Sequence, residues 1–227
     1  MKNFLLSIAI FSLFSFKSFS HVEHYAQFNY LEYELFRNNK SIGFHKYNFN
    51  REGENLSIVS EVNFKITKLG VDIYKYFAKS SENYEKGIFT GYSSKTKQNK
   101  KDRYVNIGVD TVDGSLIIDG SSYKGKANKE FIVGTWWNHE IVKAKAQISG
   151  ISGRVIEQTV TFLGKEEINI GDKTYKTLHF NFKSSDETLP DSKKLNTDIW
   201  YEEDTYLWVK AAFNKTGYWE YRIKKVK

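Results

Sequence analysis

The densest group of chemically capable residues is Trp136, Trp137, Asn138 and His139, which follow one another in the chain. Neighbouring side chains on an extended backbone point to opposite sides, so we expect one indole in the core and the other over a cavity or groove. Asn138 precedes an acidic turn and is expected to cap a short helix. The segment either plugs the end of a curled sheet or covers a ligand cavity. We take these four residues as the candidate ligand-binding site.

No local pattern of a catalytic or metal centre accompanies this segment. His45, His139 and His179 are far apart in the sequence, and the run Gly150 to Gly153 lacks the spacing of a nucleophile elbow. The chain has no cysteine, which excludes a thiol nucleophile, a disulfide and a lipid-anchoring cysteine. We therefore predict no catalytic residue, no metal site and no cofactor, and keep a hydrolase with a dispersed site as an alternative.

The first twenty residues have the organisation of an export signal. Lys2 precedes an apolar run from Phe4 to Phe16, and small residues stand at Ser18 and Ser20, where a signal peptidase reads. The run is too short to span a bilayer. We expect a signal peptide over residues 1–20, a single domain over residues 21–227 and a periplasmic or secreted location. The amine and imidazole of a new N-terminus at His21 could chelate copper, but a frayed terminus disfavours such a site.

The charge is basic, with a formal net value of +7 at pH 7. Nucleic acid is a poor fit for this charge, because lysine dominates and the five arginines are scattered. An anionic membrane surface remains a possible partner. Basic residues cluster between Lys95 and Arg103 and again between Arg222 and Lys227, where they are expected to solvate strand ends.

Alternation of apolar and polar residues dominates the chain after the signal. Between Leu56 and Ile66, for example, apolar side chains recur on one face of an expected strand. Turn signals such as Asn38-Asn39, Asp113-Gly114 and Asp119-Gly120 separate many such runs. The pattern predicts an all-β, mainly antiparallel protein, in which one meander sheet curls into a barrel or half-open barrel. A short helix or loop is expected near residues 127–146, and a loop over residues 184–195.

The C-terminal third carries Leu178-His179-Phe180, the run Asp198 to Glu203, Val209-Lys210 and Glu220-Tyr221, with Trp137-Asn138 upstream. In these motifs the chain resembles an uncharacterised family of exported Gram-negative β-rich proteins over most of residues 29–224. It departs from the family pattern at Val133-Gly134 and at Thr205. The resemblance implies a β-rich fold, distantly like the half-barrels of lipoprotein carriers, and no established activity.

These observations favour a non-enzymatic exported β protein that binds an apolar or lipid-like ligand in the concavity of its sheet. The first alternative is an envelope structural or interaction protein whose core is filled. A cavity lined by Tyr, Phe and Trp would favour the carrier, whereas three titratable groups converging in a cleft would favour the dispersed hydrolase.

Overall fold

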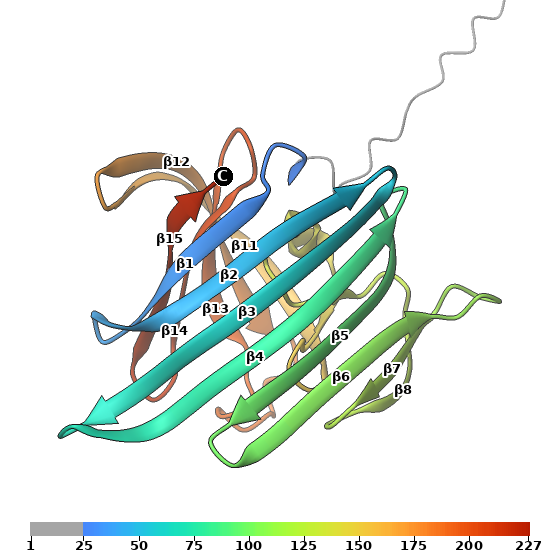
Figure 1. The fold of residues 1–227 in the computed structure, drawn as a ribbon, viewed down its shortest axis with the longest axis horizontal. Coiled ribbons are helices and arrows are strands. Elements are labelled where there is room, and N and C mark those ends of the chain that lie inside the picture. Colours follow the sequence, from blue (N-terminus) through green and yellow to red (C-terminus); the bar gives the residue numbers. More distant parts are fainter. Residues whose placement is uncertain (1–24) are drawn as a thin grey trace, which may run out of the picture.

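A computed structural model describes residues 25–227, and the predicted signal peptide with its cleavage site lies outside this range. The described chain folds almost entirely into strands, with one short 3-10 helix (Figure 1). The elements are β1 (Tyr30–Arg37), β2 (Lys40–Glu52), β3 (Asn55–Lys68), β4 (Val71–Glu85), β5 (Ile88–Gln98), β6 (Lys101–Val109), β7 (Leu116–Gly120), β8 (Lys124–Ala127), β9 (Ile132–Val133), η2 (His139–Lys143), β10 (Ala146–Ile148), β11 (Val155–Ile170), β12 (Lys173–Ser184), β13 (Asn196–Glu202), β14 (Trp208–Asn214) and β15 (Tyr218–Val226).

The strands form one 15-stranded sheet in the order β8-β7-β6-β5-β4-β3-β2-β1-β15-β14-β13-β12-β11-β10-β9. Sequential neighbours pair except β8 and β9, and β1 joins the two halves by pairing with β15. All pairs are antiparallel except β9 with β10. The sheet does not close, because β8 and β9 are its two unpaired ends. This confirms the predicted all-β meander in its half-open form.

The long strands β1 to β6 form one wall of the molecule, and β13 to β15 lie behind them in Figure 1. The alternation of apolar and polar residues explains why these segments form strands with one buried face. In β3, for example, Ile58 and Phe64 are buried, while Asn63 and Lys65 are exposed. The apolar face therefore turns toward the space between the walls. The same strand turns a buried serine, Ser60, toward this space.

The predicted turns are present, with one adjustment. Asn38 and Asn39 have φ values of 48° and 61°, as the tight β1–β2 hairpin requires. Gly120, expected in a turn, instead ends β7 and pairs with Val105. A Cβ atom at Gly120 would lie 2.5 Å from the carbonyl oxygen of Ser152. Glycine here lets the loop before β11 approach the sheet closely.

Two apolar clusters make up the core. The larger lies between the two walls and contains Trp137, Trp208 and Tyr201. The smaller contains Tyr92 and Ile118 and joins β5, β6 and β7 to β9 and β10. The segment 127–146, in which the strand pattern is interrupted, connects the two clusters. Its side chains occupy part of the space between them.

Candidate functional site

The segment that covers the concavity begins after β8 and contains the short helix that the sequence predicts. The side-chain oxygen of Asn138 accepts a hydrogen bond from the backbone N–H of Glu140 at 3.1 Å, which confirms the predicted cap. The helix, His139–Lys143, is of the 3-10 type. A stretch of this length is typical of 3-10 turns, because an α-helix needs more residues to repay its nucleation.

The two adjacent tryptophans lie in different environments, as expected. Trp137 is 1% exposed, and its ring contacts Tyr25, Phe49 and Tyr84 edge to face. Trp136 is only partly buried. Its backbone adopts a φ of 59°, so a left-handed residue, rather than plain strand alternation, separates the two indoles. Trp137 is a core residue, whereas Trp136 faces the hollow described below.

A buried carboxylate, Glu82 on β4, holds this segment against the sheet. It is 2% exposed and accepts hydrogen bonds from Tyr84 Oη at 2.6 Å, Trp137 Nε1 at 2.9 Å and Thr135 Oγ1 at 3.1 Å. Burial raises the pKa of the Glu82 carboxyl, against the opposing effect of these donors. No sequence pattern marks Glu82, because a single acidic residue on a strand resembles any solvent-facing residue.

Tyrosine hydroxyls anchor the same segment at further points. Tyr47 donates to the carbonyl oxygen of Thr135 at 2.7 Å, and Tyr201, from the opposite wall, donates to that of Trp136 at 2.8 Å. Tyr92 donates to the carbonyl oxygen of Gly150 at 3.0 Å and so anchors the following loop, between β10 and β11. These bonds satisfy backbone groups that the sheet ladder leaves free. The segment is therefore fixed to both walls.

Asn138 and His139 have structural surroundings. The side chain of Asn138 caps the helix and lies 3.5 Å from Tyr84 Oη. His139 is 6% exposed, stacks on Tyr206 with ring centroids 4.6 Å apart, and has its Nε2 atom 3.2 Å from Glu140 Oε1. Of the four candidate residues, Trp136 is the one that lines the hollow beneath the segment.

That hollow, which we call the inner chamber, has a volume of about 210 Å³. Its floor is a row of residues paired in register across four strands: Tyr47 with Ser60, Ser60 with Ser80, and Ser80 with Ser94. The Oγ atoms of Ser60 and Ser80 are 2.9 Å apart, and Ser94 donates to the carbonyl oxygen of Gly150. The chamber therefore has a hydroxyl-rich floor inside an aromatic wall.

Several polar atoms around the inner chamber are shielded from solvent and have no hydrogen-bond partner among residues 25–227. They are both ring nitrogens of His45 and Nε1 of Trp136, and the Thr96 hydroxyl lies beside that of Tyr76 in the same lining. Burial lowers the pKa of His45 to about 3, so the imidazole is neutral at physiological pH. In the sequence His45 is an isolated histidine, and no local motif marks this position.

A second hollow, the outer lobe, has a volume of about 510 Å³ and adjoins the inner chamber. The two share Tyr76, Ile151 and Tyr221 in their linings. Most of the remaining lining of the outer lobe is apolar, including Phe64 and Trp219. The two hollows together form a cavity with an apolar part and a hydrogen-bonding part.

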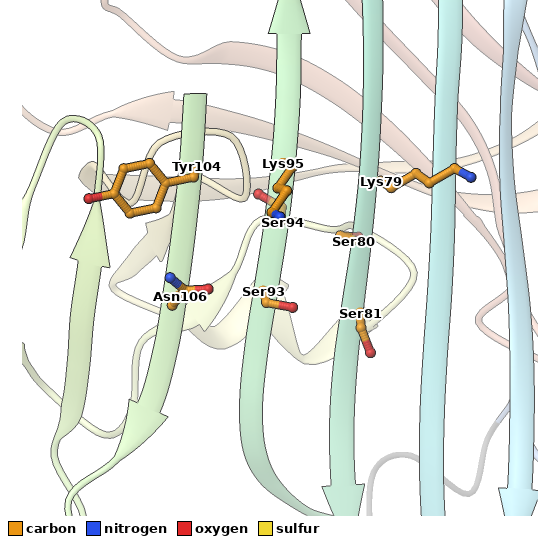
Figure 2. A pocket seen from close by; sticks show the side chains of 8 residues that line it. All are labelled: Lys79, Ser80, Ser81, Ser93, Ser94, Lys95, Tyr104 and Asn106. Atoms are coloured by element: carbon orange, nitrogen blue, oxygen red, sulfur yellow. The ribbon is translucent and has the colours of Figure 1, made fainter. Parts of the chain in front are cut away.

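A third hollow, of about 430 Å³, lies over β4, β5 and β6 and shares Ser80 and Ser94 with the inner chamber (Figure 2). Lys79, Ser81, Ser93 and Lys95 belong to the exposed or partly exposed positions of these strands. Figure 2 shows Tyr104 and Asn106 on the neighbouring strand. Two residues of the predicted basic cluster, Lys95 and Lys97, thus lie on β5 next to its hairpin with β6.

Three titratable groups meet at His179, on the strand face opposite buried Phe182. His179 Nδ1 is 2.8 Å from Glu166 Oε1, and its Nε2 is 3.4 Å from Asp198 Oδ1. The imidazole stacks on Trp200 with centroids 4.1 Å apart. None of these groups lines the inner chamber or the outer lobe, and no cluster of metal ligands occurs among the described residues.

None of the helices formed by residues 25–227 is long and apolar enough to cross a lipid bilayer. Comparison with curated proteins found no significantly similar sequence. The crystal structure of a beta-barrel-like protein of domain of unknown function DUF1849 from Brucella abortus matches this fold with a TM-score of 0.59 and 11% sequence identity. The match covers 87% of this chain and 96% of that chain.

At this low identity the likeness concerns the fold alone, and it agrees with the half-open barrel described above. A family profile, described as a domain of unknown function (DUF6134), matches residues 33–224. That range spans β1 to β15 and includes the segment over the inner chamber. The chain therefore belongs to the family of domains of unknown function DUF6134, a β-rich family without an assigned activity.

Proposed function

We propose that this protein binds an apolar or lipid-like molecule in the concavity of its sheet, beneath the segment that carries Trp136. The observation that carries the proposal is the pair of adjoining hollows, the inner chamber and the outer lobe. Small-molecule sites have volumes of roughly 300–1,000 Å³ and mostly apolar linings with a few polar groups. The aromatic lining, with Trp136, Trp219 and Tyr221, has this composition.

The proposal includes export, since the N-terminal pattern is that of a cleaved signal. A periplasmic location would bring the protein into contact with membrane lipids without the aid of an anchor. The proposed ligand binding requires no enzymatic step. Among the described residues no hydroxyl is hydrogen-bonded to the His45 nitrogens, so the chamber holds no formed Ser–His pair.

Native mass spectrometry of protein recovered from a bacterial periplasm and incubated with phospholipid vesicles tests both parts. The expected spectrum shows a chain that starts at His21 and carries a lipid-sized adduct. Trp136→Ala should weaken the adduct and lower stability less than Trp137→Ala does, because the Trp136 ring is only partly buried and packs on Trp208 and Tyr221. Trp137→Ala should lower the free energy of unfolding by about 3–5 kcal/mol, because a buried indole is removed.

The contrast between the two variants separates binding from folding. Trp137 contacts the core and Glu82 but lines neither hollow, so folded Trp137→Ala protein should still take up ligand. A wild-type protein that takes up nothing from vesicles would reject the carrier function. The filled-core structural protein would then be the better description.

A further inference from the structure

The polar atoms around the inner chamber indicate which end of a ligand it accepts. Buried polar groups in native proteins are nearly always hydrogen-bonded, and leaving one unsatisfied costs about 1–3 kcal/mol. Other unpartnered buried atoms among residues 25–227 are scattered over the fold, for example on Arg37, Ser115 and Trp208. The unpartnered ring nitrogens of His45 and Trp136, in contrast, come from separate segments and line one chamber, where a ligand would supply the missing partners.

The chamber is also free of charge. No lysine, arginine, aspartate or glutamate is among the described residues that line it. The neutral imidazole of His45 can donate from one nitrogen and accept at the other. An ionised group placed here would lose its hydration without gaining a counter-ion, which is strongly unfavourable.

The outer lobe has the complementary character. Phe64, Phe213 and Trp219 give it an apolar wall, and its one charged lining residue among those described is Lys215. Lys215 Nζ already donates to the carbonyl oxygen of Ser192 at 2.6 Å. An apolar chain fits the lobe, and the shared residues Tyr76, Ile151 and Tyr221 lie where it would pass into the chamber.

We propose that the ligand is an uncharged amphiphile, whose hydroxyl or carbonyl end lies in the inner chamber against Trp136, Thr96 and His45 and whose apolar chain fills the outer lobe. This assignment rests on the proposed function and narrows it to a ligand class and an orientation. The competing orientation places an anionic head at Lys215, on the rim of the lobe, and the chain inward. The two orientations demand opposite head-group preferences.

Two probes of equal chain length, 1-dodecanol and dodecanoate, distinguish the orientations at pH 8, where the carboxylic acid is ionised. Binding is measured by tryptophan fluorescence, since Trp136 and Trp219 line the two hollows. We expect dodecanol to bind at least about tenfold more tightly, because the chamber offers no cation to the carboxylate. Equal or tighter binding of dodecanoate would overturn the orientation while leaving ligand binding intact. Failure of both probes to bind would reject the proposed function itself.

Thr96→Val tests the polar end with almost no change of shape. The hydroxyl of Thr96 lines the chamber beside that of Tyr76, so its removal should change the free energy of unfolding by no more than one hydrogen bond, about 0.5–1.5 kcal/mol. Dodecanol affinity should fall by about three- to tenfold, the value of one hydrogen bond, with dodecanoate unaffected. Trp136→Phe, which keeps an aromatic ring but removes the N–H donor, should have the same effect on dodecanol.

Thr177→Val is the matched control. Thr177 is 1% exposed, and its hydroxyl donates to the carbonyl oxygen of Glu166 at 2.8 Å, away from both hollows. This variant should lose stability and keep the affinity of the wild type for dodecanol. An unchanged dodecanol affinity in both Thr96→Val and Trp136→Phe would overturn the placement of the polar end in the inner chamber.

Discussion

At the scale of single residues, the molecule separates side chains that the sequence presents as one group. Trp136 and Trp137 differ in burial because Trp136 adopts a left-handed backbone and Trp137 hydrogen-bonds to Glu82. Trp137 lies in the core and Trp136 lines the inner chamber, whereas a role of Trp136 in ligand binding stays a prediction. The roles of Glu82 and His45 were not predicted, because their burial depends on strand pairing and a single sequence contains no record of it.

The buried carboxyl of Glu82 leads to a prediction about how the stability of the protein depends on pH. Burial raises the pKa of its carboxyl, so the folded chain binds this proton more tightly than the unfolded chain does. The contribution of Glu82 to stability is therefore largest below its ordinary pKa and decreases as pH rises through the raised one. Glu82→Gln keeps the side-chain volume but cannot ionise. The NH2 group of the new amide is a donor, so it cannot accept the hydrogen bonds that the replaced carboxylate oxygen accepted. The substitution should lower the free energy of unfolding by about 1–3 kcal/mol.

Urea unfolding of wild-type and Glu82→Gln protein, repeated from pH 4 to pH 8, measures the difference. The gap between the two proteins should narrow as pH rises, because only the wild type loses stability by ionising Glu82. Glu85→Gln, at an exposed position of the same strand, is the control and should show no comparable trend. A gap that widens with pH would mean that the three donors outweigh burial and lower the pKa of Glu82.

At the scale of elements, local sequence patterns predicted the features that depend only on residues close together in the chain. Alternation located the strands, paired asparagines and glycines located the hairpins, and Asn138 located the start of the helix, because each depends on neighbours in sequence. The serine row on the chamber floor depends instead on the register of β3, β4 and β5. Ser60, Ser80 and Ser94 are separated by whole strands, so no periodicity brings them together. The loop expected over residues 184–195 is confirmed between β12 and β13.

The close approach of the loop before β11 to the sheet leads to a prediction about glycine substitutions. Gly153 has a φ of 78°, and a Cβ atom there would lie 2.9 Å from Ile118 Cγ2 and 3.1 Å from Val105 Cγ2. Gly171, in the β11–β12 turn, has a φ of 59° and open space around it. Both Gly→Ala variants carry backbone strain, but only Gly153→Ala also presses on the core. Its loss of stability in urea should exceed that of Gly171→Ala by about 1–3 kcal/mol. Equal losses would show that the loop moves away from the sheet without cost.

At the scale of the whole molecule, the open sheet and the segment 127–146 together create the cavity. A sheet of this length curls because its strands twist, and here its ends, β8 and β9, do not pair. The fold class was therefore predictable from strand number and turn spacing, whereas the cavity was not, since its volume depends on side chains from six or more distant segments. A contact between the basic residues on the outside of the molecule and an anionic membrane surface stays a prediction.

The most direct test of the account is a crystal structure of the protein with bound 1-dodecanol. We expect electron density for the alkyl chain beside Phe64 and Trp219, continuing past Tyr76 and Tyr221. The hydroxyl should lie within hydrogen-bond distance of Trp136 Nε1 or Thr96 Oγ1. Density confined to the exterior of the sheet, or a cavity collapsed around the side chains with no ligand inside, would contradict it.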